Sequence, residues 1–227
     1  MKGHVVRVDV DCRLAGLRST AVLRDGTAVG VRAIRPDDKE RLRTGFARLS
    51  PRSVRQRFFH PVNDLTADEL RRLTEIDFCD HVGIVLTVGT GSDERLIADS
   101  RYVRVASGGD VAEVAFTVGD DYQHRGAATL LLRELVAIAR VHGVRKFVAH
   151  VLDDNQPMLE VFRRSELPLQ ESLLDGNCVH RLVLTLDAGA LAKLRLRVRS
   201  FDLPSALKKQ WRRISDGWTR DRRHARP

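Results

Sequence analysis

The sequence predicts an α/β fold: a central sheet, mostly antiparallel with one parallel pair of strands, flanked by helices. Two observations lead to this prediction. Residues 111–152 read as a strand, a polar loop, a long amphipathic helix and a second strand, and such a right-handed crossover places the two strands parallel. The strands before and after this unit come in pairs joined by short turns, which makes those neighbours antiparallel.

Before residue 111, the chain reads as a hairpin, three helices and a second pair of strands. Turn and cap residues mark their ends: Asp25-Gly26 turns the hairpin, Pro36 and Pro51 open two helices, and Asp64 or Thr66 caps the third. The expected elements are strands 20–24 and 28–34, helices 36–49, 52–59 and 65–74, and strands 83–89 and 95–104.

From residue 111 onward, the periodicity is stronger. Residues 111–118 alternate apolar residues with small or polar ones, which is typical of a strand with one buried face. The helix that follows has an apolar stripe through Leu131, Leu135 and Ile138, and Gly143 ends it. The last expected elements are strand 146–152, helix 155–164 and a hairpin of strands 169–174 and 179–186.

Composition and charge divide the chain into parts. The 227 residues are 43% hydrophobic and 30% charged, and the net charge is +9. Residues 188–227 hold 12 of the 39 Lys and Arg but only 3 of the 30 acids, so the rest of the chain is neutral. We therefore expect an N-terminal arm or short strand over residues 1–18, one domain over residues 19–187 and a basic extension over residues 188–227.

The sequence also indicates a compartment. No uncharged apolar run approaches the roughly 18 residues of a membrane span, and the N-terminus lacks the apolar segment of a secretion signal. Cys12, Cys79 and Cys178 are odd in number and far apart, so we expect reduced thiols. The histidines show no metal-ligand spacing. These features predict a cytoplasmic protein without a bound metal.

The loop between strand 111–118 and the long helix has the composition of an anion site. It reads Gln123-His124-Arg125-Gly126-Ala127-Ala128, and its small residues would let a ligand approach the backbone. The first N–H groups of a helix have no intrahelical partner, and the helix dipole adds partial positive charge. Arg125 would add a charge-assisted contact. We therefore expect a diphosphate here.

The pattern Gln-x-x-Gly-x-Ala in this loop, followed after the next strand by Asn155 and Met158, resembles the GCN5-related N-acetyltransferase (GNAT) superfamily. The segments RPDD and RLSPRSVRQRFF, and an Asp-His pair before GIVLTV, are similar to bacterial protein-lysine acetyltransferases of that superfamily. The resemblance covers roughly residues 20–187. It implies the GNAT fold and acetyl-CoA as co-substrate, with its diphosphate on the loop.

The resemblance also implies roles for particular residues. Glu113 would be the general base that takes the proton from the amine; the alternative is a glutamate on a solvated strand face. Asn155 would bind the pantetheine arm, cap its helix, or both. A backbone N–H near Val118 would meet the thioester oxygen. The expected contacts to acetyl-CoA are Phe116, Thr117, Val118, Gln123, His124, Arg125, Gly126, Ala127, Ala128, Asn155, Met158 and Phe162.

Three positions depart from the pattern of the resembled family. Many members have a tyrosine where Phe162 stands, acting as general acid to the leaving thiolate, and Phe162 has no hydroxyl. His124 stands where glycine is frequent. Glu166-Leu167 replaces the usual Gly-Phe at the end of the helix that begins after Asn155.

The resulting prediction is an N-acetyltransferase that moves an acetyl group directly to an amine, with a protein lysine as the acceptor. Two alternatives stay open: a small-molecule amine acetyltransferase, and a catalytically weak acyl-CoA-binding sensor. In the resembled family the helices at 36–49 and 52–59 border the acceptor groove. Arg55 and Arg57 would therefore either meet an acidic acceptor surface or lie at solvated helix positions.

The basic extension contains an expected amphipathic helix over residues 203–218. Leu207, Trp211, Ile214 and Trp218 form its apolar stripe, flanked by basic residues. Such a helix would lie on an anionic membrane surface, dock an acidic partner, or pack on its own domain. Nucleic acid, bound electrostatically, is the partner that we favour least.

Overall fold

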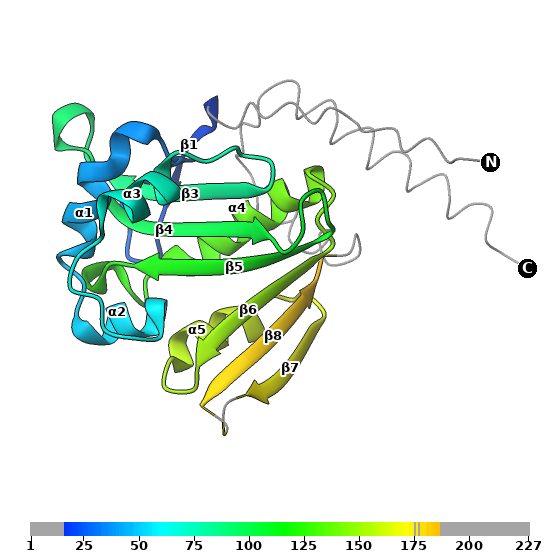
Figure 1. Ribbon diagram of the computed structural model, residues 1–227. Helices are drawn as coiled ribbons and strands as arrows, with labels where there is room; N and C mark the ends of the chain where they lie inside the picture. The colour runs from blue at the N-terminus through cyan, green and yellow to red at the C-terminus, as the bar shows by residue number, and fades with distance from the viewer. Residues whose placement is uncertain (1–15, 175, 177, 187–227) are drawn as a thin grey trace, which may run out of the picture.

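The computed structural model describes residues 16–174, 176 and 178–186. Within these residues, an eight-stranded sheet has the strand order β1-β2-β3-β4-β5-β6-β8-β7 (Figure 1). Neighbouring strands are antiparallel except β5 and β6, which are parallel as predicted. The strands are β1 (Arg18–Val22), β2 (Ala28–Ala33), β3 (His81–Val88), β4 (Arg95–Arg104), β5 (Val111–Val118), β6 (Lys146–Leu152), β7 (Leu169–Leu174) and β8 (Val179–Thr185).

The helices lie on both faces of this sheet. Helix α4 packs on one face with α5 beside it, and α1, α2 and α3 gather on the other. They are α1 (Lys39–Phe46), α2 (Pro51–Phe58), α3 (Ala67–Thr74), α4 (Ala127–Val141) and α5 (Gln156–Arg163), with the 3-10 turns η2 (Pro36–Asp38), η3 (Gly91–Asp93) and η4 (Asp120–Tyr122). The predicted mixed α/β architecture is confirmed.

Two hydrophobic cores follow from this arrangement. The larger lies between α4 and the sheet, and the fully buried side chains there include Tyr102, Leu131 and Phe147. The smaller lies beneath α1, α2 and α3 and is built on Phe46 and Leu70. Because successive side chains of a strand point to opposite faces, the alternation in β5 sends its apolar side chains to the larger core and leaves its small and polar ones on the face of α1–α3.

The parallel strands β5 and β6 separate part of the way along. Their pairing joins Val111–Glu113 to Lys146–Val148 and goes no further, although β5 continues to Val118 and β6 to Leu152. Over these remaining residues, β5 stays paired with β4, and β6 with β8. Figure 1 shows the two strands diverging toward α2 and α5. The sheet therefore opens between β5 and β6 just beyond Glu113.

Helix boundaries differ from the expected ones where capping residues intervene. The helix expected over 36–49 is instead η2 followed by α1, and it ends at Phe46 because Ser50 caps α2 by accepting a hydrogen bond from the N–H of Ser53. Helix α3 begins at Ala67, since Thr66 and Glu69 form a reciprocal capping box before it.

Several expectations concern features at or beyond the edge of the described residues. Most of the N-terminal arm and the whole basic extension, including the helix expected over 203–218, lie outside the described residues. Among those described, no helix has both the length and the apolar character needed to span a bilayer.

Cys178 is an exposed free thiol, but Cys79 is disulfide-bonded, so the expectation of reduced thiols is wrong for Cys79. The spacing of the cysteines along the chain therefore did not predict that Cys79 forms a disulfide.

Glu134 on α4 gives a testable pH dependence of stability. It is buried, with 6% of its surface exposed, and burial raises the pKa of its carboxyl from 4.5 to about 7. Between these values the folded chain holds a proton that the unfolded chain has released, so the free energy of unfolding falls as pH rises through this window. The gap corresponds to about 3 kcal/mol.

We therefore expect Glu134→Gln to unfold at higher urea concentration than the wild type at pH 8, and the difference to shrink at pH 5. Glu40→Gln, at an exposed position of α1, is the matched control and should leave the pH profile unchanged. Parallel pH profiles for the wild type and Glu134→Gln would contradict this assignment.

Candidate active site

A carboxylate and an imidazole meet where β5 and β6 part. Glu113 is the last paired residue of β5 and lies opposite Val148 of β6. His150 lies two residues further along β6 and so points to the same face; its Nδ1 lies 3.3 Å from Oε1 of Glu113. The side chain of Glu113 is 60% exposed and that of His150 is 33% exposed. The carboxylate of Glu113 is therefore open to solvent and beside a partly exposed imidazole.

The N-terminus of α4 is open to a ligand. Gly126 occupies its N-cap with φ of 90°, and no side chain caps the N–H groups of the first turn. Ala127 and Ala128 follow with small side chains, and the side chain of Arg24 lies beside Gly126, where an added Cβ would be 3.3 Å from its Nε. Uncapped N–H groups together with the helix dipole attract an anion, and a diphosphate fits this end of the helix.

Gln123 holds the loop in place from the side of α2. Its Nε2 donates to Oγ of Ser53 at 3.1 Å and to the carbonyl oxygen of Val118 at 3.2 Å. Both Ser53 and Ser50 also donate to Asp120. Burial opposes ionisation of Asp120, but the hydrogen bonds from Ser50 and Ser53 keep the pKa of its carboxyl below the ordinary value. The side chain of Gln123 is thus engaged with protein atoms and positions the loop.

His124 and Arg125 of this loop lie in different surroundings. His124 is exposed and has φ of 59°, a left-handed conformation that explains why glycine suits this position. Arg125 donates to Asp25 at 2.6 Å in the turn between β1 and β2, and its guanidinium lies 5.4 Å from the ring centroid of Tyr122. In this structure the charge of Arg125 is paired with Asp25.

Residues 116–118 and α5 form the two sides of the opening. Phe116 packs edge to face on Phe162 at 5.8 Å, and Phe162 is 1% exposed, so its ring is part of the larger core. Asn155 caps α5 by accepting from the N–H of Met158 at 3.3 Å, which confirms its capping role. Thr117 points to the opposite face of β5, toward α1 and α2. Glu166 has φ of 61°, which explains the preference for glycine there.

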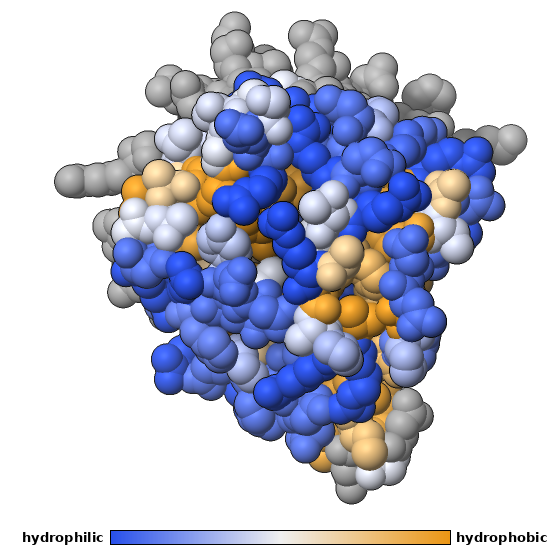
Figure 2. All heavy atoms as spheres, turned by 90° about the vertical axis from the view of Figure 1, so that its left-hand side faces the viewer, coloured by the Kyte–Doolittle hydropathy of each residue, from blue (hydrophilic) through white to orange (hydrophobic). Residues whose placement is uncertain are grey.

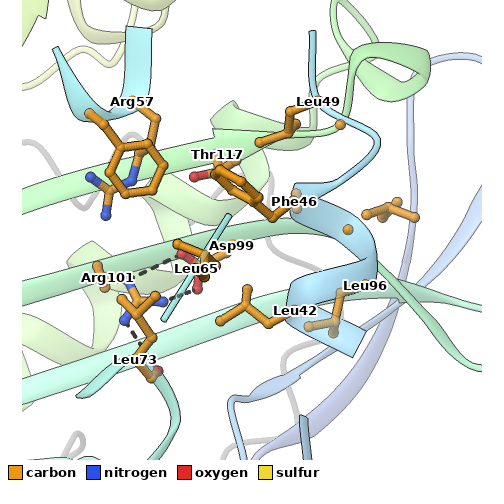
Figure 3. Close-up of a pocket in the computed structure, with 15 residues that line it drawn as sticks. Leu42, Phe46, Leu49, Arg57, Leu65, Leu73, Leu96, Asp99, Arg101 and Thr117 are labelled. Carbon is orange, nitrogen blue, oxygen red and sulfur yellow. Dashed lines mark hydrogen bonds and ion pairs between the residues drawn. The ribbon is translucent and has the colours of Figure 1, made fainter. Parts of the chain in front are cut away.

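Helix α2 reaches across the opening to the turn between β6 and α5. Arg55 forms an ion pair with Asp154, and Nη2 of Arg52 donates to the carbonyl oxygen of Asp154 at 3.1 Å. The side chain of Arg57 turns inward instead, into a cavity beneath α1 and α2 (Figure 3). In this structure, therefore, Arg55 is paired within the chain and Arg57 faces the interior.

His150 is the residue near Glu113 that sequence reasoning missed. Its position follows from the register of β5 on β6, and single-sequence periodicity predicts that the two strands are parallel but not their register. No group of three or more His, Cys, Asp or Glu side chains in the described part of the chain is arranged to hold a metal ion.

Comparison with known proteins places this geometry in a family. The Acetyltransferase (GNAT) family model matches residues 8–165. Acetyltransferase Pat of Mycolicibacterium smegmatis is 39% identical over 142 residues, which are 63% of this chain and 42% of that protein. The chain thus spans less than half the length of this curated relative.

Solved structures agree with the sequence comparison. The GNAT domain of S. lividans PAT is 40% identical with a TM-score of 0.67, covering 74% of this chain and 96% of that one. A putative acetyltransferase from Salmonella typhimurium, solved with its cofactor acetyl-CoA, is 14% identical with a TM-score of 0.57, covering 71% of this chain and 96% of that one. Because the Salmonella typhimurium protein is only 14% identical, its similarity supports the fold alone. Because the family model matches well over half of the chain and the S. lividans domain is matched almost throughout, this chain belongs to the acetyltransferase (GNAT) family.

Proposed function

We propose that the chain is an acetyl-CoA-dependent N-acetyltransferase that moves an acetyl group directly to the side-chain amine of a protein lysine. The observation that carries this proposal is the position of Glu113 at the point where β5 and β6 part, on the strand that leads into the uncapped N-terminus of α4. The segments similar to bacterial protein-lysine acetyltransferases support the choice of acceptor.

Acetyl-CoA would be held mainly by the backbone. The N–H groups of the first turn of α4 would bind its diphosphate, worth roughly 0.3–2 kcal/mol for the dipole alone. The unpaired stretch of β5 beyond Glu113 and the N-terminus of α5 at Asn155 would border its pantetheine arm. Acetyl-CoA would supply an acyl group activated as a thioester, and the residues that bind it would position the thioester beside Glu113.

The chemical difficulty lies in the acceptor amine. With a lysine pKa near 10.4, only about one side chain in a thousand is neutral at pH 7.4. Glu113 would take one proton from the lysine ammonium; the neutral amine would then attack the thioester, forming the N–C bond as the C–S bond breaks. The nitrogen would release its second proton to solvent, and the thiolate would take up a proton from solvent. His150, in contact with Glu113 and partly exposed, would orient the carboxylate and return the proton to solvent. Phe162 offers no hydroxyl to assist the leaving thiolate.

A thiol-release assay tests the proposal. The chain is incubated with acetyl-CoA and, in parallel, with lysine-containing proteins, with the same proteins after chemical blocking of their lysines, and with polyamines. We expect thiol release that requires free protein lysines and a matching mass increase of one acetyl group on the acceptor. Thiol release with polyamines only would show that the acceptor is a small amine and not a protein lysine. Acetyl-CoA binding without turnover on either panel would contradict the transferase itself.

We expect His150→Ala to lower kcat roughly two- to tenfold, because the variant loses one hydrogen bond of about 0.5–1.5 kcal/mol to the proposed base. The KM for acetyl-CoA should change little, since the hydrogen bond that the variant loses is to Glu113 and not to the N-terminus of α4. His150→Gln keeps a hydrogen-bond donor and should recover part of the rate. Wild-type kcat in both variants would remove His150 from the mechanism.

A further inference from the structure

A cavity of about 60 Å³ lies on the sheet face that carries Glu113, between the sheet and helices α1, α2 and α3 (Figure 3). Since roughly 10–15 Å³ of such volume admits one water, the cavity has room for a group of several heavy atoms. On the side of the molecule that carries α1 and α2, apolar side chains show between hydrophilic ones (Figure 2). The apolar residues that the helix side contributes to the lining are Leu42, Phe46, Leu49, Phe58, Leu65 and Leu73, and β4 adds Leu96, Ile97 and Ala98.

The strand side of the cavity carries a buried ion pair. Nη2 and Nε of Arg101 donate to the two carboxylate oxygens of Asp99 at 2.7 and 3.2 Å, and Nη1 donates to the carbonyl oxygen of Leu73 at 3.2 Å. Both charged side chains are almost fully buried. Both oxygens of Asp99 are therefore engaged by Arg101, and its charge is already balanced.

Arg57 adds a second guanidinium to the lining of the cavity. It enters the cavity from α2, and no hydrogen bond or ion pair joins it to any residue that the structure describes. Its contact is with the ring of Phe58, at 5.1 Å from the centroid. Burial, and then the positive charge of Arg101, lower the pKa of Arg57, and the carboxylates of Asp99 and Glu113 only partly offset this effect. The lining thus carries two positive charges and one negative charge.

We propose that this cavity binds a carboxylate carried on a short apolar stem, with the carboxylate paired to Arg57. A guanidinium held among apolar side chains is unfavourable until an anion pairs with it, and its planar donors match a carboxylate. The leucine and phenylalanine side chains would cover the methylene groups of the stem.

The carboxylate would belong to one of the two substrates of the transfer. This step rests on the proposed function. One is the acyl donor, if its acyl group ends in a carboxylate, as in succinyl-CoA. The other is the acceptor, if an acidic side chain lies next to its reactive lysine. Both would enter from the face shared by Glu113, Ala115 and Thr117.

Binding is tested on the full chain without turnover, by calorimetric or NMR titration with butyrate and with its neutral isostere butyramide. We expect butyrate to bind at least fivefold more tightly than butyramide, Arg57→Met to abolish the difference, and Arg57→Lys to keep part of it. Arg71→Met, which removes an exposed guanidinium from α3, is the matched control and should behave as the wild type. Equal binding of the two probes, binding of neither, or preference for butyrate that survives in Arg57→Met would overturn the proposal.

The source of the carboxylate is then read from two series of rates. One compares succinyl-CoA with acetyl-CoA on a single acceptor; the other compares acetyl-CoA transfer to lysine peptides with Glu or Gln beside the lysine. If Arg57→Met removes a preference for succinyl-CoA, the carboxylate belongs to the acyl donor; if it removes a preference for Glu beside the lysine, the carboxylate belongs to the acceptor. No effect of Arg57→Met in either series would show that no substrate uses the cavity. Because butyrate binding needs no catalysis, failure of the transferase proposal would leave that measurement intact.

Discussion

Glu113→Gln is expected to lower kcat by roughly 10²–10⁴-fold, the range that a placed general base contributes, while the affinity for acetyl-CoA stays at the wild-type value. Glutamine has the size and shape of glutamate and keeps an oxygen near Nδ1 of His150, so the opening between β5 and β6 should keep its form. It cannot accept the amine proton. The lysine acceptor then reacts only from the small neutral fraction present in solution.

The measurement separates binding from chemistry. Calorimetric titration gives the affinity for acetyl-CoA, and thiol release at saturating acceptor gives kcat. Glu75→Gln, at an exposed position after α3 where the carboxylate pairs with Lys39, is the matched control and should retain both values. A kcat within threefold of the wild type would exclude Glu113 as the base. A parallel loss of acetyl-CoA affinity would instead indicate that the carboxylate supports the shape of the site.

The sequence predicted the architecture well because the relevant signals are local. The alternation in residues 111–118, the apolar stripe of α4 and the turn residues between strands each depend on neighbours within a few positions. From these the parallel pair β5–β6 followed, and the structure confirms it. The helix ends were less well predicted, since the cap at Ser50 competes with continuation of α1.

Side-chain partners were beyond such reasoning because they join distant segments. Arg125 pairs with Asp25, one hundred positions away, and Gln123 binds Ser53. The difference between Arg55 and Arg57 shows the same limit: both lie on α2, yet one spans the opening to Asp154 and the other enters the cavity. Which direction each takes depends on how α2 is rotated against β5, and a single sequence does not contain that angle.

Phe162 illustrates how the structure restricts a role that resemblance implied. The resembled enzymes often have a tyrosine there, whose hydroxyl would need access to the leaving thiolate. In this chain the ring is buried against Phe116 and belongs to the larger core. A phenylalanine satisfies that packing without leaving a hydroxyl in need of a partner. The mechanism that we propose therefore relies on proton removal at Glu113 and leaves protonation of the thiolate to solvent.

Gly126→Asp is expected to weaken acetyl-CoA binding at least 100-fold, equivalent to about 2.7 kcal/mol. The new carboxylate would stand at the N-cap of α4, where the diphosphate would bind, and would both occupy the space and repel it. Helix α4 is held by the burial of its apolar face in the larger core, so the loss of binding would not reflect loss of α4. The remaining cost is the left-handed backbone at φ of 90°, about 1–2 kcal/mol for a residue with a side chain.

Gly143→Asp provides the control for that backbone cost. Gly143 lies just beyond the other end of α4, has φ of 79°, and has no atom within 4 Å of an added Cβ. A Cβ at Gly126 would lie 3.3 Å from Cγ and Nε of Arg24, so the two variants share the backbone cost and any further loss of stability in Gly126→Asp comes from that contact. Only Gly126→Asp should lose acetyl-CoA in calorimetric titration. Equal affinities in the two variants would mean that the diphosphate binds elsewhere. A selective loss at Gly126 would place the diphosphate at the N-terminus of α4, beside the side chain of Arg24.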